Sequence, residues 1–433
     1  MTRGHRNNLA VMKTSITKKV ITAISLLATL GLGASLPAVA KPGPSVTIKD
    51  DPGCSKPAKG KVACLSIRRT RSVNGVRGTV RPLATVQPMG GVAYGANQIR
   101  SAYSVTQRGA RYKVIAVVIA YHSESAYQDL LDYRAMYNLG PMQNCTNPAE
   151  PGMVGTVIRA VPAGDKPCFM QLDQTGAAVG FHETDNDGWA QEAALDLQMA
   201  TAICPNCSLA LVEAKTASLT DLNLAVGAAS EIKNVRSISN SYGGSDNGEF
   251  KYPAYAAAAG KGIAVVASSG DSGYGSSAPA SFASVVAVGG TSLRIDAGGN
   301  YASESAWNKG GSGCSTYNKA SSWQPVYLTG CAGKFSADVA AVADPATGVA
   351  VSYGGQWYTL GGTSVSAPII AGMYAIGPKF GASAGEFTLA NANLLHDITI
   401  GSNGPCDVKY WCNARTGWDG PTGLGTPNGA GAF

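Results

Sequence analysis

Apolar runs alternate with amphipathic runs along most of the chain. Runs that are apolar on both faces predict buried strands, some leading into turns, at residues 112–121, 208–214, 235–244, 262–273 and 284–290. Runs with one apolar face predict helices at residues 125–139, 188–203, 219–232 and 252–261. Buried strands separated by helices indicate an α/β fold with a mostly parallel central sheet and helices on both faces. In such sheets the reactive side chains gather in loops beyond the carboxyl ends of the strands.

The first 40 residues differ from the rest, with five basic residues, no acidic residue and an apolar run over residues 20–36. The run leads into Ala38-Val39-Ala40, so residues 1–40 predict a secretory signal peptide cleaved after Ala40. A membrane anchor is the alternative, but the apolar run is short for one. No later stretch is apolar enough to span a bilayer, and we expect a secreted protein, extracellular or periplasmic, without a membrane span.

Charge divides the remaining chain into a basic arm and an acidic main part. The net charge of +7 falls to +2 without the five basic residues of the leader. Residues 41–84 hold ten Lys and Arg against two Asp, so residues 85–433 carry a net charge of −6. The basic arm lacks interleaved aromatic residues and a helical pattern, which favours a solvated linker over a nucleic-acid-binding segment. We therefore expect no nucleic-acid partner.

Ten cysteines behind a predicted leader argue for disulfides. Their spacing predicts five local pairs: Cys54–Cys64, Cys145–Cys168, Cys204–Cys207, Cys314–Cys331 and Cys406–Cys412. The CxxC at residues 204–207 could instead form half of a zinc site, but no second CxxC or HxxxH motif completes one.

The stretch GGTSVSAPIIAG at residues 361–372 places Ser364 where a loop meets an apolar, helix-like run. Backbone N–H groups at a helix start can stabilise an anion, which suits the nucleophile of a serine peptidase. Pro368 fits a first helical turn. Taken alone, Ser364 is better explained as a helix cap, but the twelve-residue context favours the nucleophile.

Glu192 and Asp196 are four residues apart on a predicted helix and therefore share one face. A solvated acidic stripe would have basic partners nearby, yet no Lys or Arg lies between Lys166 and Lys215. The same interval holds seven acidic residues: Asp173, Glu183, Asp185, Asp187, Glu192, Asp196 and Glu213. When two carboxyls lie close together among other negative charges, their pKa values separate and one keeps its proton well above its normal pKa. Such a pair can act as a general base in acidic solution.

Asp271 lies in SSGDSG at the end of a predicted buried strand. The sequence Asp-Ser-Gly is common in turns, so Asp271 could be an ordinary turn residue. A protonated Asp271 could also donate a hydrogen bond to the oxyanion formed when Ser364 attacks. The alternative base is His182, which would make the chain a subtilisin-type hydrolase. Against it, the turn-forming acidic run ETDNDG follows His182 where a helix start would be expected.

These motifs, with YGANQIRSAYSV, EAALD, ASFASVVAVGGTS, ESAWN and ADVAAVADPATGV, make the chain resemble the sedolisins from residue 94 to its end. Sedolisins are secreted serine-carboxyl peptidases with a subtilisin-like fold. The resemblance implies an endopeptidase that acts on proteins or peptides at acidic pH, and we expect a monomer. It implies that Ser364 is the nucleophile, Glu192 the general acid/base, Asp196 its orienting partner and Asp271 the oxyanion-hole acid. An inactive binding protein of the same fold is the alternative, disfavoured because all four positions are intact.

The resemblance also implies a Ca²⁺ site near the C-terminus. Its ligands would be Asp397, Ile398, Arg415, Gly417 and Asp419, in HDIT and ARTGWDGPTGLG. Two carboxylates with carbonyl oxygens suit a hard cation such as Ca²⁺. A Gly-rich terminal turn is the alternative, and Arg415 stands where the family prefers Gly.

Sedolisins usually carry a long folded pro-domain, which this chain lacks room for between its leader and its peptidase domain. We expect residues 41–90 to be a basic linker or a short pro-segment and residues 91–433 to be the peptidase domain. The basic arm could dock on the acidic domain as a short inhibitor, or the protein could be made without one.

Overall fold

The computed structural model describes residues 45–73, 76–77, 93–179, 188–381 and 383–433. The predicted signal peptide and His182 lie outside these residues. Within the described ranges, no helix combines the length and apolar character needed to cross a membrane.

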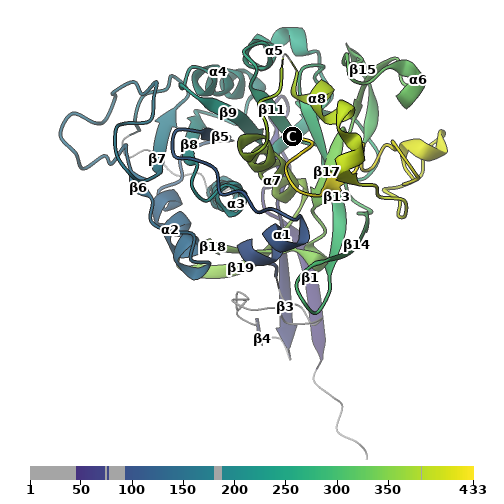
Figure 1. The fold of residues 1–433 in the computed structure, drawn as a ribbon, viewed down its shortest axis with the longest axis horizontal. Coiled ribbons are helices and arrows are strands. Elements are labelled where there is room, and N and C mark those ends of the chain that lie inside the picture. Colours follow the sequence, from purple (N-terminus) through teal and green to yellow (C-terminus); the bar gives the residue numbers. More distant parts are fainter. Residues whose placement is uncertain (1–44, 74–75, 78–92, 180–187, 382) are drawn as a thin grey trace, which may run out of the picture. The chain divides into compact units, whose positions relative to one another are not determined.

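A nine-stranded sheet forms the centre of the fold (Figure 1). Eight strands follow the order β14-β13-β11-β9-β5-β8-β7-β6, and β17 also pairs with β13. Every pairing is parallel except that of β13 with β14, which confirms the predicted mostly parallel sheet. The strands are β5 (Val114–Ala120), β6 (Gln143–Asn144), β7 (Cys168–Asp173), β8 (Ser208–Ala214), β9 (Val235–Asn240), β11 (Ala264–Ser268), β13 (Val286–Ile295), β14 (Tyr301–Ala306) and β17 (Val339–Val342).

Helices cover both faces of this sheet, as the alternating pattern predicts. α3 and α7 pack on one face and on each other, while α4 and α5 pack on the opposite face (Figure 1). The helices are α1 (Ala96–Ala102), α2 (Ala126–Met136), α3 (Trp189–Ile203), α4 (Leu219–Ser230), α5 (Pro253–Gly260), α6 (Val326–Thr329), α7 (Thr363–Ile376) and α8 (Ala384–Ala390). All residues of α3 and α7 are buried, so polar side chains on these helices lie in the core.

The start of α7 differs from the prediction. The helix begins at Thr363, so Pro368 lies in its second turn rather than its first. Proline has no N–H, which leaves the carbonyl oxygen of Ser364 without its usual helical donor. The Ser241 hydroxyl donates to that oxygen instead, at 3.4 Å. A proline is therefore tolerated inside this helix because a neighbouring loop satisfies the freed carbonyl.

The basic arm forms strands where it is described. β1 (Val46–Pro52) pairs antiparallel with β3 (Ile67–Val73), which pairs with β19 (Gln356–Gly361), and β18 (Val349–Tyr353) completes the order. β2 (Ala63–Cys64) pairs with β10 (Tyr242–Ser245), beside β12 (Ser277–Ala278). The arm therefore contributes β1, β2 and β3 to sheets of the main fold, and these strands are not a solvated linker. The pro-segment interpretation stays a prediction.

Smaller elements complete the fold. Short ladders join β15 (Gly313–Lys319) to β16 (Gly333–Ser336) and β20 (Leu395–His396) to β21 (Thr426–Pro427). All five predicted cysteine pairs form disulfides, so the CxxC at residues 204–207 is a disulfide and not half of a zinc site.

Candidate active site

The predicted site residues meet where the strands β9 and β11 end and α7 begins. Asp271 follows β11 by three residues, and Ser364 is the second residue of α7. Glu192 and Asp196 lie on α3, which packs against α7. The structure therefore brings all four side chains to the carboxyl edge of the parallel sheet, where ligands of such folds bind.

Ser364 is completely buried beneath polypeptide. Its hydroxyl donates a hydrogen bond to the Ser241 carbonyl at 3.3 Å, and its backbone N–H donates to the Leu65 carbonyl at 3.4 Å. The residue that caps α7 is Gly362, and no side chain caps the helix. The helix-cap interpretation of Ser364 therefore does not hold.

Glu192 and Asp196 are both fully buried on the face of α3 that meets α7. Burial raises the pKa of Glu192; contacts with the side chains of Ser364 and Ser66 oppose that rise. Burial and the charge of Glu192 raise the pKa of Asp196 well above its ordinary value. No carboxyl oxygen of this pair has a partner in hydrogen-bond geometry among the described residues. Since no cation among the described residues compensates burial, the pair holds at least one proton well above the usual carboxyl range.

Asp271 is a third carboxyl at this edge; the residue is partly exposed, but its Oδ2 is buried. Its Oδ1 accepts hydrogen bonds from the Thr363 N–H and hydroxyl, both at 2.8 Å, whereas its Oδ2 has no hydrogen-bond partner among the described residues. Burial raises its pKa to about 7, although Thr363 and the charge of Lys309 oppose the rise. A protonated Oδ2 is thus available as a donor beside the N–H of Ser364.

Gly362 shows why this corner requires a glycine. Its φ of 97° lies in the left-handed region, and a Cβ there would stand 2.0 Å from the Leu65 carbonyl oxygen and 2.6 Å from Asp271 Oδ2. Any side chain would collide with both oxygens. The backbone, the carboxyl and a peptide carbonyl therefore converge on one small space.

The described histidines are engaged elsewhere. The Nδ1 of His122 lies 2.7 Å from Glu213 Oε2, and this partner raises its pKa against the opposing effect of burial. The ring of His396 stacks on Tyr301 with centroids 3.8 Å apart, and burial lowers its pKa. The Ser364 hydroxyl donates to the Ser241 carbonyl and its N–H to the Leu65 carbonyl.

The predicted calcium ligands lie together in the C-terminal loop. Asp419 is buried, and burial together with the charge of Asp397 raises its pKa to about 7. The Arg415 N–H donates to Asp419 Oδ2 at 3.0 Å, and the Gly417 N–H donates to Asp397 Oδ2 at 2.9 Å. A cation between two such carboxylates would relieve their repulsion, so the donor set fits Ca²⁺. Ile398, which would contribute its carbonyl, has a buried side chain. Within the described ranges no cluster of three His, Cys, Asp or Glu could hold a metal, so carbonyl oxygens would have to complete this site.

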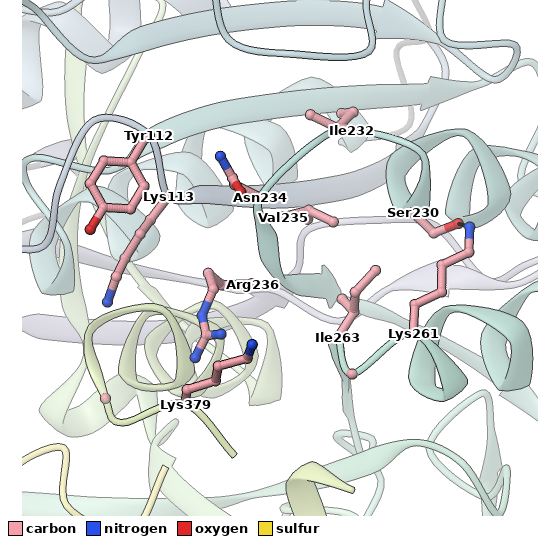
Figure 2. Close-up of a pocket in the computed structure, with 12 residues that line it drawn as sticks. Tyr112, Lys113, Ser230, Ile232, Asn234, Val235, Arg236, Lys261, Ile263 and Lys379 are labelled. Atoms are coloured by element: carbon pink, nitrogen blue, oxygen red, sulfur yellow. Dashed lines mark hydrogen bonds between the residues drawn. The ribbon is translucent and has the colours of Figure 1, made fainter. Parts of the chain in front are cut away.

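A prominent pocket lies at the other end of the sheet. It is lined by basic side chains at the amino ends of β5, β9 and β11, and Figure 2 shows Lys113, Arg236, Lys261 and Lys379 around it. Lys113 donates to the Ala375 carbonyl at 2.8 Å, so this cation already has a partner. The pocket is remote from the carboxyl ends of the strands and takes no part in the candidate active site.

Sequence reasoning missed several residues that shape the site. Ser241, Gly362 and Thr363 were not singled out, although the last two belong to the same motif as Ser364. Leu65 and Ser66 come from the basic arm and carry no motif that would connect them to the site. The charge of Lys309 lowers the pKa of Asp271, but Lys309 is distant from Asp271 in sequence, so sequence proximity does not connect the two residues.

Comparison with known proteins places this site in a recognisable setting. The subtilase family model matches residues 175–378. Sedolisin from Pseudomonas sp. (strain 101) is 35% identical over 205 residues, covering 40% of this chain and 34% of sedolisin. Kumamolisin from Bacillus sp. (strain MN-32) is 33% identical over 279 residues, covering 57% of this chain and 50% of kumamolisin. The chain thus spans half or less of the length of these curated relatives.

A solved structure shows the same fold. It is that of Pseudomonas sedolisin, a serine-carboxyl proteinase, complexed with two molecules of pseudo-iodotyrostatin. The TM-score is 0.63 at 24% sequence identity, and the superposition covers 78% of this chain and 96% of that one.

Proposed function

We propose that this chain, a homologue of sedolisin and kumamolisin with a subtilisin-like fold, is a secreted serine-carboxyl peptidase that cleaves proteins in acidic solution. The carrying observation is that three carboxyls with raised pKa values lie together beside Ser364, and that among the described residues no cation acts on the two fully buried ones, Glu192 and Asp196. A buried carboxyl that keeps its proton can donate a hydrogen bond, and one that shares a proton can accept another. This arrangement supplies acid and base without histidine.

In the proposed reaction, the Ser364 hydroxyl attacks the substrate carbonyl and gives its proton to Glu192. Asp196, on the same helix face, shares the remaining charge and holds Glu192 toward Ser364. The Ser364 N–H and protonated Asp271 donate hydrogen bonds to the developing oxyanion. Glu192 then passes its proton to the leaving amine, and water hydrolyses the acyl-enzyme in the reverse order of proton transfers.

Endopeptidase action is supported by residues 62–66, which cross the site with polypeptide continuing on both sides. A site that accommodates an internal segment does not require a free chain end. The five disulfides support secretion, because such bonds persist in oxidising compartments.

The first test is Ser364→Ala with Ser366→Ala as its matched control. Ser366, on the same buried helix, donates to the Ala341 and Val342 carbonyls and does not reach the carboxyls. We expect Ser364→Ala to remove proteolysis of denatured protein at acidic pH while the thermal midpoint stays within a few degrees. Ser366→Ala should keep activity. Turnover by Ser364→Ala equal to that of the parent would rule out Ser364 as nucleophile.

We further propose that Asp397 and Asp419 hold Ca²⁺ with the carbonyls of Ile398, Arg415 and Gly417. When bound, the cation would stabilise the C-terminal loop by mass action. Chelator should lower the thermal midpoint of the parent, and Asp419→Ala should lower it and abolish the response to chelator. A midpoint that chelator leaves unchanged in both proteins would contradict the site.

A further inference from the structure

Residues 62–66 of the basic arm lie across Ser364 as an added strand. Cys64 and Ala63 pair antiparallel with Tyr242 and Gly243, and the Leu65 N–H donates to the Ser241 carbonyl at 3.3 Å. On the other side, the Val62 N–H donates to the Ala217 carbonyl at 2.9 Å. Extended peptides bind to exposed sheet edges through this kind of main-chain pairing.

The carbonyl oxygen of Leu65 lies at the start of α7, against the backbone of Ser364. It accepts a hydrogen bond from the Ser364 N–H at 3.4 Å. The same oxygen and Asp271 Oδ2 both face the space above Gly362, at 2.0 Å and 2.6 Å from where a Cβ would stand. The Leu65 oxygen thus lies beside the Ser364 N–H and Asp271 Oδ2, the two donors that the proposed mechanism assigns to the oxyanion. The next residue, Ser66, contacts Glu192 through both its side chain and its backbone.

Apolar side chains of the segment rest on glycines of the site. A Cβ on Gly243 would stand 3.0 Å from Leu65 Cδ1, and one on Gly244 would stand 2.9 Å from Val62 Cγ1. The absence of side chains at these two glycines leaves room for apolar groups next to the backbone. The site therefore receives Leu65 and Val62 as it would receive apolar side chains of a substrate.

The segment is braced on both sides of the Leu65–Ser66 bond. The Cys54–Cys64 disulfide closes the loop before it, and the Gly53 N–H donates to the Ser66 carbonyl at 2.7 Å. After it, β3 pairs with both β1 and β19, and the Arg68 guanidinium donates to Gln191 at 3.0 and 3.2 Å. A tethered and preorganised ligand loses little entropy on binding and has a high effective concentration.

We propose that residues 62–66 are an internal, substrate-like inhibitor of the active site, and that the Leu65–Ser66 bond is the one presented to Ser364 for self-cleavage. This inference rests on the proposed function and extends it to regulation and to a preference for Leu before the cleaved bond. The short basic arm thus does the work of keeping the enzyme latent.

The cleavage step balances with groups that the site contains. Ser364 Oγ forms an ester with the Leu65 carbonyl carbon as its proton moves to Glu192. The Leu65–Ser66 C–N bond breaks, and the Ser66 nitrogen takes the proton from Glu192. Water then hydrolyses the ester, which leaves a carboxyl at Leu65 and a free amine at Ser66. The disulfide joins two residues before the cleaved bond, so only non-covalent pairing retains the released piece.

Hydrogen exchange tests the occupancy without requiring any turnover. In the Ser364→Ala protein we expect the Leu65 amide to exchange at least about 100-fold more slowly than an unstructured amide. Adding Leu65→Glu, which places a charge against Gly243 and the buried carboxyls, should remove this protection. Leu65→Gly provides a second, milder variant if the charged one fails to fold. Fast exchange at Leu65 in the Ser364→Ala protein would overturn the proposal.

Mapping of chain ends tests the cleavage. Acidified wild-type protein should yield a new amino terminus at Ser66, and Ser364→Ala should remain intact. Cleavage at another bond, or at this bond in Ser364→Ala, would refute Leu65–Ser66 as the presented bond. Slow Leu65 exchange without turnover of an external peptide would refute the proposed function but not the occupancy. Fast Leu65 exchange together with Ser364-dependent turnover of an external peptide would refute the occupancy but not the proposed function.

Initial rates on an external peptide test the inhibition. Leu65→Glu should start at least about tenfold faster than freshly acidified wild type, because the fraction of free sites limits the apparent activity. Ile48→Glu is the matched control, since Ile48 lies on β1 of the same arm and its side chain is 53% exposed. It should behave like wild type. Equal initial rates for Leu65→Glu and wild type would refute an inhibitory role.

Discussion

Asp338 and Asp196 are both buried carboxyls in one protein, but their surroundings are opposite. Asp338 receives hydrogen bonds from a backbone N–H, an indole, an amide and an ammonium group, provided by Ala287 (2.7 Å), Trp323 (2.7 Å), Gln324 (2.6 Å) and Lys334 (2.5 Å). Asp196 has no hydrogen bond in good geometry among the described residues and has Glu192 as a like-charged neighbour. Asp338 thus has four donors and a cation around it, whereas burial and the charge of Glu192 raise the pKa of Asp196.

The difference between the two carboxyls lies in whether other groups offset the cost of burying a charge. At Asp338 the cost of burying a carboxylate is offset by a buried cation on β16 and by three further donors, one on β13 and two in the loop before α6. At the candidate active site the cost of burying a charged carboxyl is not fully offset, and burial therefore raises the pKa values of Glu192, Asp196 and Asp271. Carboxyls that are buried without partners are poor for stability but suited to acid–base chemistry.

The strongest way to break this comparison is Glu192→Gln. A neutral amide cannot accept the proton of Ser364, so activity should fall on the order of 10⁴-fold, or about 5 kcal/mol of transition-state stabilisation. Stability should stay equal or rise, because no buried cation loses its partner. Turnover of denatured protein at acidic pH and the urea midpoint measure the two effects. Retained activity, or a large loss of stability, would show that Glu192 is a structural group like Asp338.

The reverse substitution, Asp338→Asn, should give the reverse result. It leaves Lys334, which is fully buried, without its counter-charge, and should lower the free energy of unfolding by about 4 kcal/mol. The folded fraction should keep normal turnover per active site, since Asp338 does not contact Ser364. Urea unfolding together with active-site-normalised rates would test this. A stable but inactive Asp338→Asn protein would contradict the division between the two regions.

Much of the central fold was predictable because its signals are local. The run at residues 208–214 is apolar on both faces, and β8 has those same limits. The predicted helix at residues 219–232 ends at Ser230 as α4, with Ser218 accepting from the Asp221 N–H at its start. Burial patterns of this kind depend on neighbours in sequence, so they can be read without the partner strands.

The sequence predicted the four residues of the candidate active site but not the basic arm that lies against them. Motifs singled out Ser364, Glu192, Asp196 and Asp271. The packing of α3 on α7 brings the first three together, and the hydrogen bonds from Thr363 place Asp271 at the start of α7. Their roles stay predictions. The arm was misread because IRRTRSV, the sequence of β3, is rich in charge and finds its partner in the distant strand β19. Pairing between remote strands leaves no pattern within either one, so the arm resembled a linker.

The comparison can be sharpened by measuring stability against pH. Burial raises the pKa of Asp271 from 3.8 to about 7, so the folded state holds this proton more tightly than the unfolded state does. Such a group stabilises fully below its unfolded pKa, and the contribution is lost as pH rises toward 7. The parent, studied as Ser364→Ala to prevent self-digestion, should therefore lose stability between pH 4 and 7. About 3 kcal/mol of this loss should be absent from the protein that also carries Asp271→Asn.

The same titration should set the alkaline limit of activity. Asp271 must stay protonated to donate to the oxyanion, so turnover should fall as pH rises through about 7. The acid limit should come from full protonation of the Glu192 and Asp196 pair, which then cannot accept the proton of Ser364. Asp271→Asn should remove or displace the alkaline limb, whereas His182→Ala should move neither limb. If His182→Ala abolishes activity, or turnover is fastest in alkaline solution, histidine is the base, and the unpartnered carboxyls are not the source of the chemistry.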